Sequence, residues 1–322
     1  MKKALSVVRA AAALWLVACS ACALAQAYPS KPVRLVAAFP AGGTSDVIAR
    51  LLAEQMGPAL GQPVVVENRV GSNGMIGTDY VAKSVPDGYT ILLAPSGHAI
   101  NNSLNPNVPY DPIKDFTMIT LIGTVPMVVT VNPGVPANSL RELIELARAK
   151  PGAVNFGSGG PGSSNQLATE LFTSMAGIRM THIPYKGDTP GIADLLGGHI
   201  ALIFLNTPAA LPLVKGGKAR ALAITSAERS PLLPDVPAVA ESLPGYAAGS
   251  WHGIFGPAGV PPEIVKRLNT EFVAVIRAPA VSAKLRGMGV NVVGNSPEAF
   301  TEFVRAEIVK WAQVIKAANV KL

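Results

Sequence analysis

The chain has 322 residues, of which 49% are hydrophobic, so it is long enough to bury two separate cores. Its formal net charge of +7 comes from scattered basic residues without aromatic interleaving, which argues against a nucleic-acid-binding protein. The only two cysteines, Cys19 and Cys22, lie near the N-terminus, so we expect neither a disulfide framework nor a cysteine-based metal site.

The first residues have the order of a secretory signal peptide. Lys2, Lys3 and Arg9 precede an apolar stretch that ends near Ala18, and small residues follow it. The apolar part is shorter than the roughly 20 residues that a membrane-spanning helix needs. We therefore predict that residues 1–25 are a signal peptide and that the chain is exported to the periplasm. The mature chain would then carry 24 basic and 20 acidic residues, a net charge of +4.

Two cleavage sites compete in this segment. The sequence from Leu16 to Cys19 also fits a lipoprotein signal, in which Cys19 would be lipidated and would anchor the chain to a membrane. The small residues Ala23 and Ala25 fit ordinary cleavage just before the first predicted strand. We prefer ordinary cleavage, because the apolar stretch and the downstream small residues are a complete signal without the cysteine.

Beyond the signal, short β-like runs alternate with amphipathic helical segments, which predicts an α/β fold. A helix after the first strand is indicated by apolar residues at helical spacing from Val47 to Met56. The segment from Ser139 to Glu142 is a capping box that opens a helix through Ala149. In chain order, strands are expected at residues 33–39, 64–66, 89–94, 154–156, 180–185, 200–204 and 221–225, and two helices after Pro261 and Ser296 finish the chain.

Two further β-like segments predict crossings between two lobes. Residues 118–131 form an unusually long run, and residues 251–255 are expected to return. We therefore predict one lobe from residues 28–123 with 251–322 and a second from residues 124–250. Two crossing strands make a hinge, and a hinge between two lobes makes a cleft that can close.

Two glycine-rich loops share the order strand, glycine loop, hydroxyl residues, helix. They cover residues 40–46 and 157–165. Backbone N–H groups in such loops and the helix N-termini behind them favour anions, so loops facing each other across the cleft would hold a carboxylate from both sides. The alternative is that the glycines only turn tight corners. Asp46, in the first helical turn, is expected to stabilise that helix end rather than bind an anion, unless it holds a ligand hydroxyl or a water.

Other motifs are weak. The spacing Gly157-x-Gly159-x-x-Gly162 matches a dinucleotide fingerprint, but the next strand ends in Tyr185-Lys186 rather than in an acid. No nucleophile elbow or helical histidine pair is present, so we predict no enzyme activity, no metal and no cofactor. His98 follows a Pro-Ser-Gly turn, and Tyr185 and Lys186 end a strand, so all three are candidate cleft residues.

The chain closely resembles the tripartite tricarboxylate transporter receptors, also called the Bug family of periplasmic binding proteins. The resemblance covers the whole mature chain and lies in many motifs that occur in order. These include Phe39-Pro40-Ala41-Gly42-Gly43, Val66-Glu67-Asn68-Arg69, Pro86-Asp87-Gly88-Tyr89-Thr90, Tyr110-Asp111-Pro112, Pro184-Tyr185-Lys186-Gly187, Asp194-Leu195-Leu196-Gly197-Gly198, Pro234-Asp235-Val236-Pro237, Trp251-x-Gly253, Pro257-Ala258-Gly259-Val260-Pro261 and Glu307-x-x-Lys310-Trp311.

The resemblance implies a two-lobed periplasmic binding protein of type II and a cleft ligand that is a di- or tricarboxylate, an amino acid or an aromatic acid. The family delivers such ligands to a permease with one large and one small membrane subunit; the alternative is a sensor that docks on a histidine-kinase ectodomain. We expect a monomer. Together with the candidates above, the predicted ligand-binding residues are Phe39, Ala41, Gly42, Gly43, Thr44, Ser45, Asp46, Ser96, His98, Ser158, Ser163, Ser164, Asn165, Tyr185, Lys186 and Asn206.

One departure from the family pattern bears on the ligand. Where many relatives have Phe-Asp-Asn, this chain has Phe204-Leu205-Asn206. An acid at the middle position would favour a ligand amine or hydroxyl. Leu205 therefore predicts a more apolar or purely anionic ligand and makes amino acids less expected, provided that its side chain does not point into the core.

Overall fold

A computed structural model describes residues 28–320, and the predicted signal peptide and Cys19 lie outside this range. Within it, a 10-stranded sheet runs in the order β2-β1-β3-β9-β4-β7-β5-β6, and β8 and β10 also pair with β4. The strands are β1 (Val33–Ala37), β2 (Val64–Asn68), β3 (Thr90–Pro95), β4 (Phe116–Val131), β5 (Asn155–Ser158), β6 (Thr181–Pro184), β7 (Leu202–Asn206), β8 (Arg220–Ile224), β9 (Gly249–Pro257) and β10 (Asn291–Val292).

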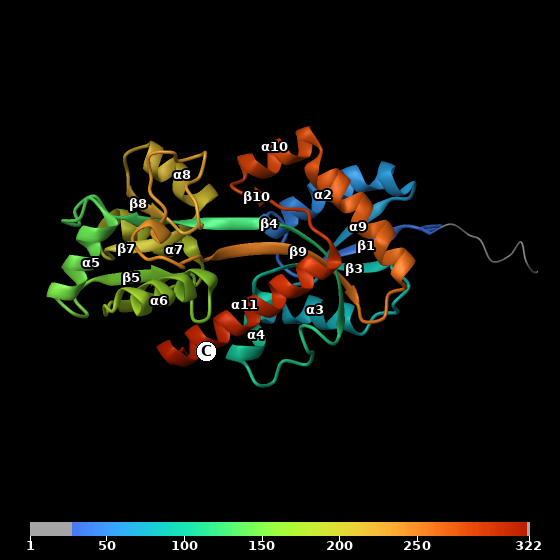
Figure 1. Ribbon diagram of the computed structural model, residues 1–322, viewed down its shortest axis with the longest axis horizontal. Coiled ribbons are helices and arrows are strands. Elements are labelled where there is room, and N and C mark those ends of the chain that lie inside the picture. The colour runs from blue at the N-terminus through green and yellow to red at the C-terminus, as the bar shows by residue number, and fades with distance from the viewer. Residues whose placement is uncertain (1–27, 321–322) are drawn as a thin grey trace, which may run out of the picture.

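Eleven of the helical segments in this range surround the sheet on both sides (Figure 1). They are α2 (Thr44–Leu60), η1 (Ser72–Gly74), α3 (Met75–Ala82), α4 (Gly97–Leu104), α5 (Leu140–Ala149), α6 (Ser164–Ala176), α7 (Asp188–Gly197), α8 (Thr207–Lys215), α9 (Pro262–Arg277), α10 (Pro279–Gly287) and α11 (Pro297–Ala318), with a further turn, η2 (Val239–Glu241). No helix of residues 28–320 is both long and apolar enough to cross a membrane.

The long strands β4 and β9 connect two groups of shorter strands, as Figure 1 shows. In the first group, β1 pairs in parallel with β2 and β3, and β3 pairs with β9. In the second, β5 pairs in parallel with β6 and β7. The first part of β4 pairs with β9, whereas its last residues pair with β7 and β8. The predicted α/β class and the two crossing strands are confirmed.

Alternation along the strands produces a core on each face of the first group. Leu35 and Ile91 pack on one face with α2 and α9, whereas Val36 and Leu92 pack on the other with Trp251 of β9. Adjacent residues of a strand point to opposite faces, so both faces of a central strand must be covered by helices. The near-continuous apolar run that predicted β1 follows from this two-sided burial.

The second group is built in the same way. Val129 and Phe204 pack on the face covered by α5 and α6, and Val128 and Leu205 pack on the opposite face near α7 and α8. The predicted N-terminal cap of α5 is present, because Ser139 Oγ accepts a hydrogen bond from the N–H of Glu142 at 3.2 Å. The Glu142 carboxylate accepts from the N–H of Asn138 rather than from that of Ser139, which makes the box one residue wider than predicted.

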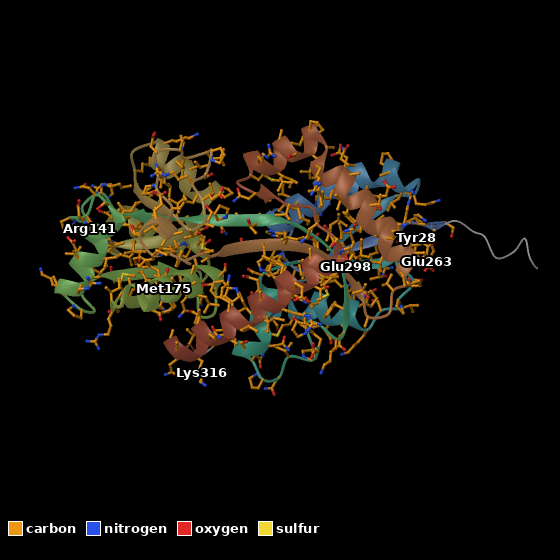
Figure 2. All side chains as sticks on the ribbon, viewed as in Figure 1. Tyr28, Arg141, Met175, Glu263, Glu298 and Lys316 are labelled. Carbon is orange, nitrogen blue, oxygen red and sulfur yellow. The ribbon has the colours of Figure 1, made fainter. Side chains whose placement is uncertain are left out.

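The C-terminal helix contacts both groups. Phe300 and Val304, near its beginning, pack against Trp251 and Phe255 of the first group. Further along, Trp311, Val314 and Ile315 form a small core with Ile100 of α4 and Leu167 of α6. Figure 2 shows Glu298 at the start of this helix and Lys316 near its end, on the side of Met175 of α6. The predicted lobe limits, 28–123 with 251–322 and 124–250, remain a proposal.

Candidate ligand-binding site

A cavity of about 730 Å³ lies where the two groups of strands face each other. This volume is in the range of small-molecule sites. Both glycine-rich loops reach it, as do the starts of α4, α7 and α8. The predicted residues that line it are Phe39, Gly43, Thr44, Ser45, Ser96, Ser163, Ser164, Asn165 and Asn206.

The loop after β1 is held together by Asp46. Gly42 has a φ of 80°, which favours glycine, and its N–H donates to Asp46 Oδ2 at 2.9 Å. Arg50 Nε donates to the same oxygen at 3.0 Å, and Asn68 Nδ2 donates to Asp46 Oδ1 at 2.9 Å. Hydrogen bonding from Arg50 lowers the pKa of Asp46 to about 2. Asp46 is therefore ionised, fully engaged and outside the cavity lining, which favours its predicted role in stabilising the helix end.

The loop after β5 has the same construction without the charge. Gly162 has a φ of 74°, and its N–H donates to Gln166 Oε1 at 2.8 Å. Asn165 Oδ1 accepts from the N–H groups of Gly159 and Gln166, each at 3.1 Å. Ser163 Oγ donates to Gly160 O at 2.6 Å, so the loop is ordered by its own side chains.

Helix N-termini without side-chain caps meet at the cavity. The N-cap residues of α2, α4, α6, α7 and α8 are Gly43, Ser96, Ser163, Gly187 and Asn206, and none of their side chains caps its helix. All of them line the cavity. Of the helices that begin elsewhere, α5 and α11 are capped by Ser139 and Ser296, whereas α3, α9 and α10 also begin without a side-chain cap. The first N–H groups of a helix need an acceptor, so these ends are available to an anionic ligand.

Basic side chains are absent from the cavity lining. Among residues 28–320, the lining contains no Lys or Arg, and its one histidine is His252. Burial lowers the pKa of His252 to about 4, so the ring is neutral near pH 7. Any attraction for an anion must therefore come from backbone N–H groups and from neutral hydroxyl, amide and imidazole side chains. Such a site suits a carboxylate or a similar small anion.

His252 was missed as a candidate because the four histidines are scattered along the sequence. It lies on β9, and its Nε2 is 3.1 Å from Ser45 Oγ in the first glycine loop. Ser250, two residues earlier, also lines the cavity. Residues two apart in a strand point to the same side of the sheet, so Ser250 and His252 could have been predicted together once β9 was known to border the cleft. Three further lining residues, Pro40, Gly159 and Gly162, lie in the two predicted loops but were not named individually; those missed were Asn73, Pro95, Gly97, Ile100, Gly187, Asp188, Thr189 and Phe204.

His98 is placed in the core rather than at the cavity. It is 2% exposed, lies among Tyr110, Phe116 and Phe255, and donates from Nε2 to Pro112 O at 2.9 Å. Burial lowers its pKa to about 4. We therefore leave His98 out of the proposed contacts.

The other predicted residues lie outside the cavity lining. The Ser158 hydroxyl is buried and hydrogen bonds with His182 Nε2 at 2.6 Å. Tyr185 donates its hydroxyl hydrogen to Asp194 Oδ2 at 2.6 Å, and burial helps to raise its pKa to about 12. Lys186 is exposed. The remaining residues outside the lining are Ala41, Gly42 and Asp46.

The side chain of Leu205 does not reach the ligand region. It is 0% exposed and packs in the core beside Val128 and Ile203. The prediction that Leu205 makes amino acids less expected ligands is therefore unsupported, because the condition attached to it is not met.

A larger hollow, of about 1030 Å³, lies beside β2 and α3 and shares no lining residue with the cavity. It is bordered by charged surface residues that include Lys31, Arg34 and Asp87. Helix N-termini do not converge on it among its described lining residues. We therefore take the smaller cavity as the candidate site.

Comparisons with known proteins agree with the fold. The sequence profile described as "Tripartite tricarboxylate transporter family receptor" matches residues 48–320. The protein BugT of Bordetella pertussis is 40% identical over 301 residues, which are 92% of each chain. A solved Rhodopseudomonas palustris protein, MatC with bound malate, is 30% identical with a TM-score of 0.75 and covers 89% of this chain and 100% of its own. An R. palustris structure with adipate is 39% identical with a TM-score of 0.79, covering 92% of this chain and 99% of the other.

Proposed function

Because this chain belongs to the tripartite tricarboxylate transporter family of periplasmic receptors, as predicted from its motifs, we propose that it binds a small di- or tricarboxylate or aromatic acid in the cavity between its two groups of strands. The bound acid is then delivered to a permease of the tripartite tricarboxylate class. The protein performs no chemistry on the ligand and needs no cofactor.

The observation that carries this proposal is the meeting of uncapped helix N-termini at a cavity without basic side chains. The ends of α2 and α6 come from different groups of strands, so a carboxylate between Thr44 and Ser164 would receive N–H groups from both. Each helix end carries roughly half a positive charge. A ligand held in this way would favour closure of the two groups about β4 and β9.

The similar structures support the ligand class. The two R. palustris proteins were solved with adipate and with malate, which are both small dicarboxylates. Their fold similarity extends over 92% and 89% of this chain. The loops and uncapped helix ends at the cavity of this chain are suited to a ligand of that kind.

Thermal unfolding against a panel of acids tests the proposal. The panel contains adipate, malate, succinate, citrate, glutamate, benzoate and nicotinate. An acid at about 100 times its Kd stabilises the folded state by roughly 2.7 kcal/mol, which shifts the midpoint by a few degrees. A shift with at least one acid supports the proposal, and no shift with any acid contradicts it.

Two substitutions on the same helix show whether the acid binds at the cavity. Ser164→Asp adds a negative charge at the start of α6, in the cavity lining, and should abolish the shift. Ser174→Asp adds the same charge at the exposed far end of α6 and should retain it. An equal shift of the unfolding midpoint in both variants would mean that the acid binds outside the cavity.

The partner is tested separately from the ligand. Ligand-loaded protein should be retained by membranes that contain the large and small permease subunits of this transporter class. Retention by a histidine-kinase ectodomain instead would assign the protein to sensing, and turnover of the bound acid would contradict a receptor without enzyme activity.

A further inference from the structure

The cavity contains one acidic side chain that the binding of a simple carboxylate does not explain. Asp188 is the first residue of α7 and lines the cavity. Among residues 28–320 it is the only Asp, Glu, Lys or Arg in the lining. A negative charge at this place repels the anion that the surrounding helix ends attract.

Asp188 is held in a fixed position by the second glycine loop. Asn165 Nδ2 donates to Asp188 Oδ1 at 2.9 Å, and Asn165 also orders the loop through Gly159. A Cβ atom added to Gly159 would lie 2.9 Å from Asp188 Oδ1, so the carboxylate lies directly against the loop backbone. The side chain is therefore an ordered part of the cavity wall.

The carboxylate has no cationic partner in the described part of the chain. No ion pair of Asp188 is formed, and Asn165 supplies its one side-chain hydrogen bond. The residue is half-buried, and desolvation raises the pKa of its carboxyl group. Asp46, the corresponding acid at the start of α2, instead has Arg50, Asn68 and the N–H of Gly42.

Stabilisation of the α7 N-terminus is the alternative role for Asp188. An acid in the first helical turn has this effect wherever it points. That role explains neither the position in the cavity lining nor the contact with Asn165. It also predicts no effect on the choice of ligand, so the two roles can be separated by experiment.

We propose that Asp188 selects carboxylates that carry a second group able to donate a hydrogen bond, namely a hydroxyl or an ammonium group. This inference rests on the proposed function and names the ligand class more closely. The ligand donor bonds to Asp188, while the ligand carboxylate binds the helix N-termini.

Calorimetric titration with matched acids tests the inference. One series is succinate, malate and aspartate; the other is adipate, 2-hydroxyadipate and 2-aminoadipate. Within each series only one substituent changes, from hydrogen to hydroxyl to ammonium. The wild type should bind a substituted acid about tenfold or more tightly than the unsubstituted one, because hydrogen bonds to an ionised group are strong. A comparison of the affinities for the hydroxyl acid and the ammonium acid of each series shows which of the two donors the site prefers.

Variants then assign the preference to Asp188. Asp188→Asn and Asp188→Ser should lose the preference, and their affinity for the unsubstituted acid should stay the same or rise. Asp194→Asn is the matched control, because Asp194 lies on the same helix, bonds to Tyr185 and is not in the cavity lining. It should keep the wild-type preference.

Equal binding of all acids in a series by the wild type would overturn the inference and leave a receptor for simple carboxylates. Retention of the preference by both Asp188 variants would also overturn it. If none of the six acids binds, the inference is overturned, and the proposed function is then tested by the tricarboxylates and aromatic acids of the thermal-unfolding panel.

Discussion

The two glycine-rich loops have the same backbone construction but different charges. In the loop after β1 the N–H of Gly42 donates to Asp46, and in the loop after β5 the N–H of Gly162 donates to Gln166, four residues later in each case. The N-cap residues, Gly43 and Ser163, follow these glycines directly. The first loop therefore uses an ionised acceptor and the second a neutral one.

The charged acceptor brings further partners with it. Asp46 is accompanied by Arg50, which balances its charge beside an anion site, and by Asn68, which also donates to Phe39 O at 3.0 Å. Gln166 needs no counter-charge, and its amide Nε2 lies 3.2 Å from Nδ1 of His182. The same turn can thus be fixed by a charged acceptor with a nearby arginine, as at α2, or by a neutral acceptor, as at α6.

Each loop also contacts a histidine from another strand, β9 for the first loop and β6 for the second. His252 lies beside Ser45 of the first loop. His182 lies between Ser158 and Gln166 of the second. Because the amide of Gln166 donates to Nδ1, the proton of neutral His182 is on Nε2. The two rings differ in burial, since His252 is buried and His182 is half-buried.

The largest expected effect is the acid sensitivity that His252 gives to the first loop. Burial lowers its pKa from 6.5 to about 4, so the unfolded chain binds a proton between these values and the folded chain does not. The contribution of neutral His252 to the free energy of unfolding is therefore fully present above pH 6.5. It is lost as the pH is lowered, and the loss reaches about 3 kcal/mol at pH 4. In His252→Gln this part of the loss should disappear, as measured by denaturant unfolding without ligand at pH 7 and pH 4.

His98 contributes to the same pH range, because burial lowers its pKa to about 4 as well, so the variant retains part of the acid sensitivity. His199→Gln, at an exposed position, is the control and should follow the wild type. Identical losses in His252→Gln and the wild type would show that His252 titrates normally in the folded protein.

Removal of the two acceptors should destabilise the loops unequally. Asp46→Ala should lower the free energy of unfolding by about 2 kcal/mol and Gln166→Ala by about 1 kcal/mol, because hydrogen bonds to charged groups contribute more than neutral ones. Urea denaturation at pH 7 measures both values. Asp46→Asn keeps one acceptor oxygen and should fall between the wild type and Asp46→Ala. Equal losses in the two alanine variants would remove the distinction between the loops.

The smallest of the three effects concerns ligand affinity. Gln166→Glu gives the second loop the charge of the first without an arginine to balance it. Affinity for the bound acid should fall about tenfold, or by about 1.4 kcal/mol, and the loss should shrink at high salt. The titration is made at pH 8, where His182 is neutral because burial lowers its pKa. An equal loss in Gln166→Ala would mean that loop geometry, not charge, is responsible.

Local sequence patterns predicted much of this protein. Apolar runs marked β1, β3 and β4 because strands covered on both faces are apolar throughout. Glycines followed by hydroxyl residues marked both loops, because a positive φ at Gly42 and Gly162 and an open helix end each require particular residue types. The family that the ordered motifs predicted was confirmed by the comparisons.

Only the tertiary structure decided which side chains enter the cavity. His98 and His252 are equally isolated in the sequence, yet one ring points into the aromatic core and the other towards Ser45. Likewise, strand pairing turns Leu205, which the sequence analysis singled out, into the core, whereas the turn before α7 brings Asp188, which it did not, against Asn165. Such contacts join residues far apart in the chain, and they depend on which strands pair and where the helices pack, which no local pattern specifies.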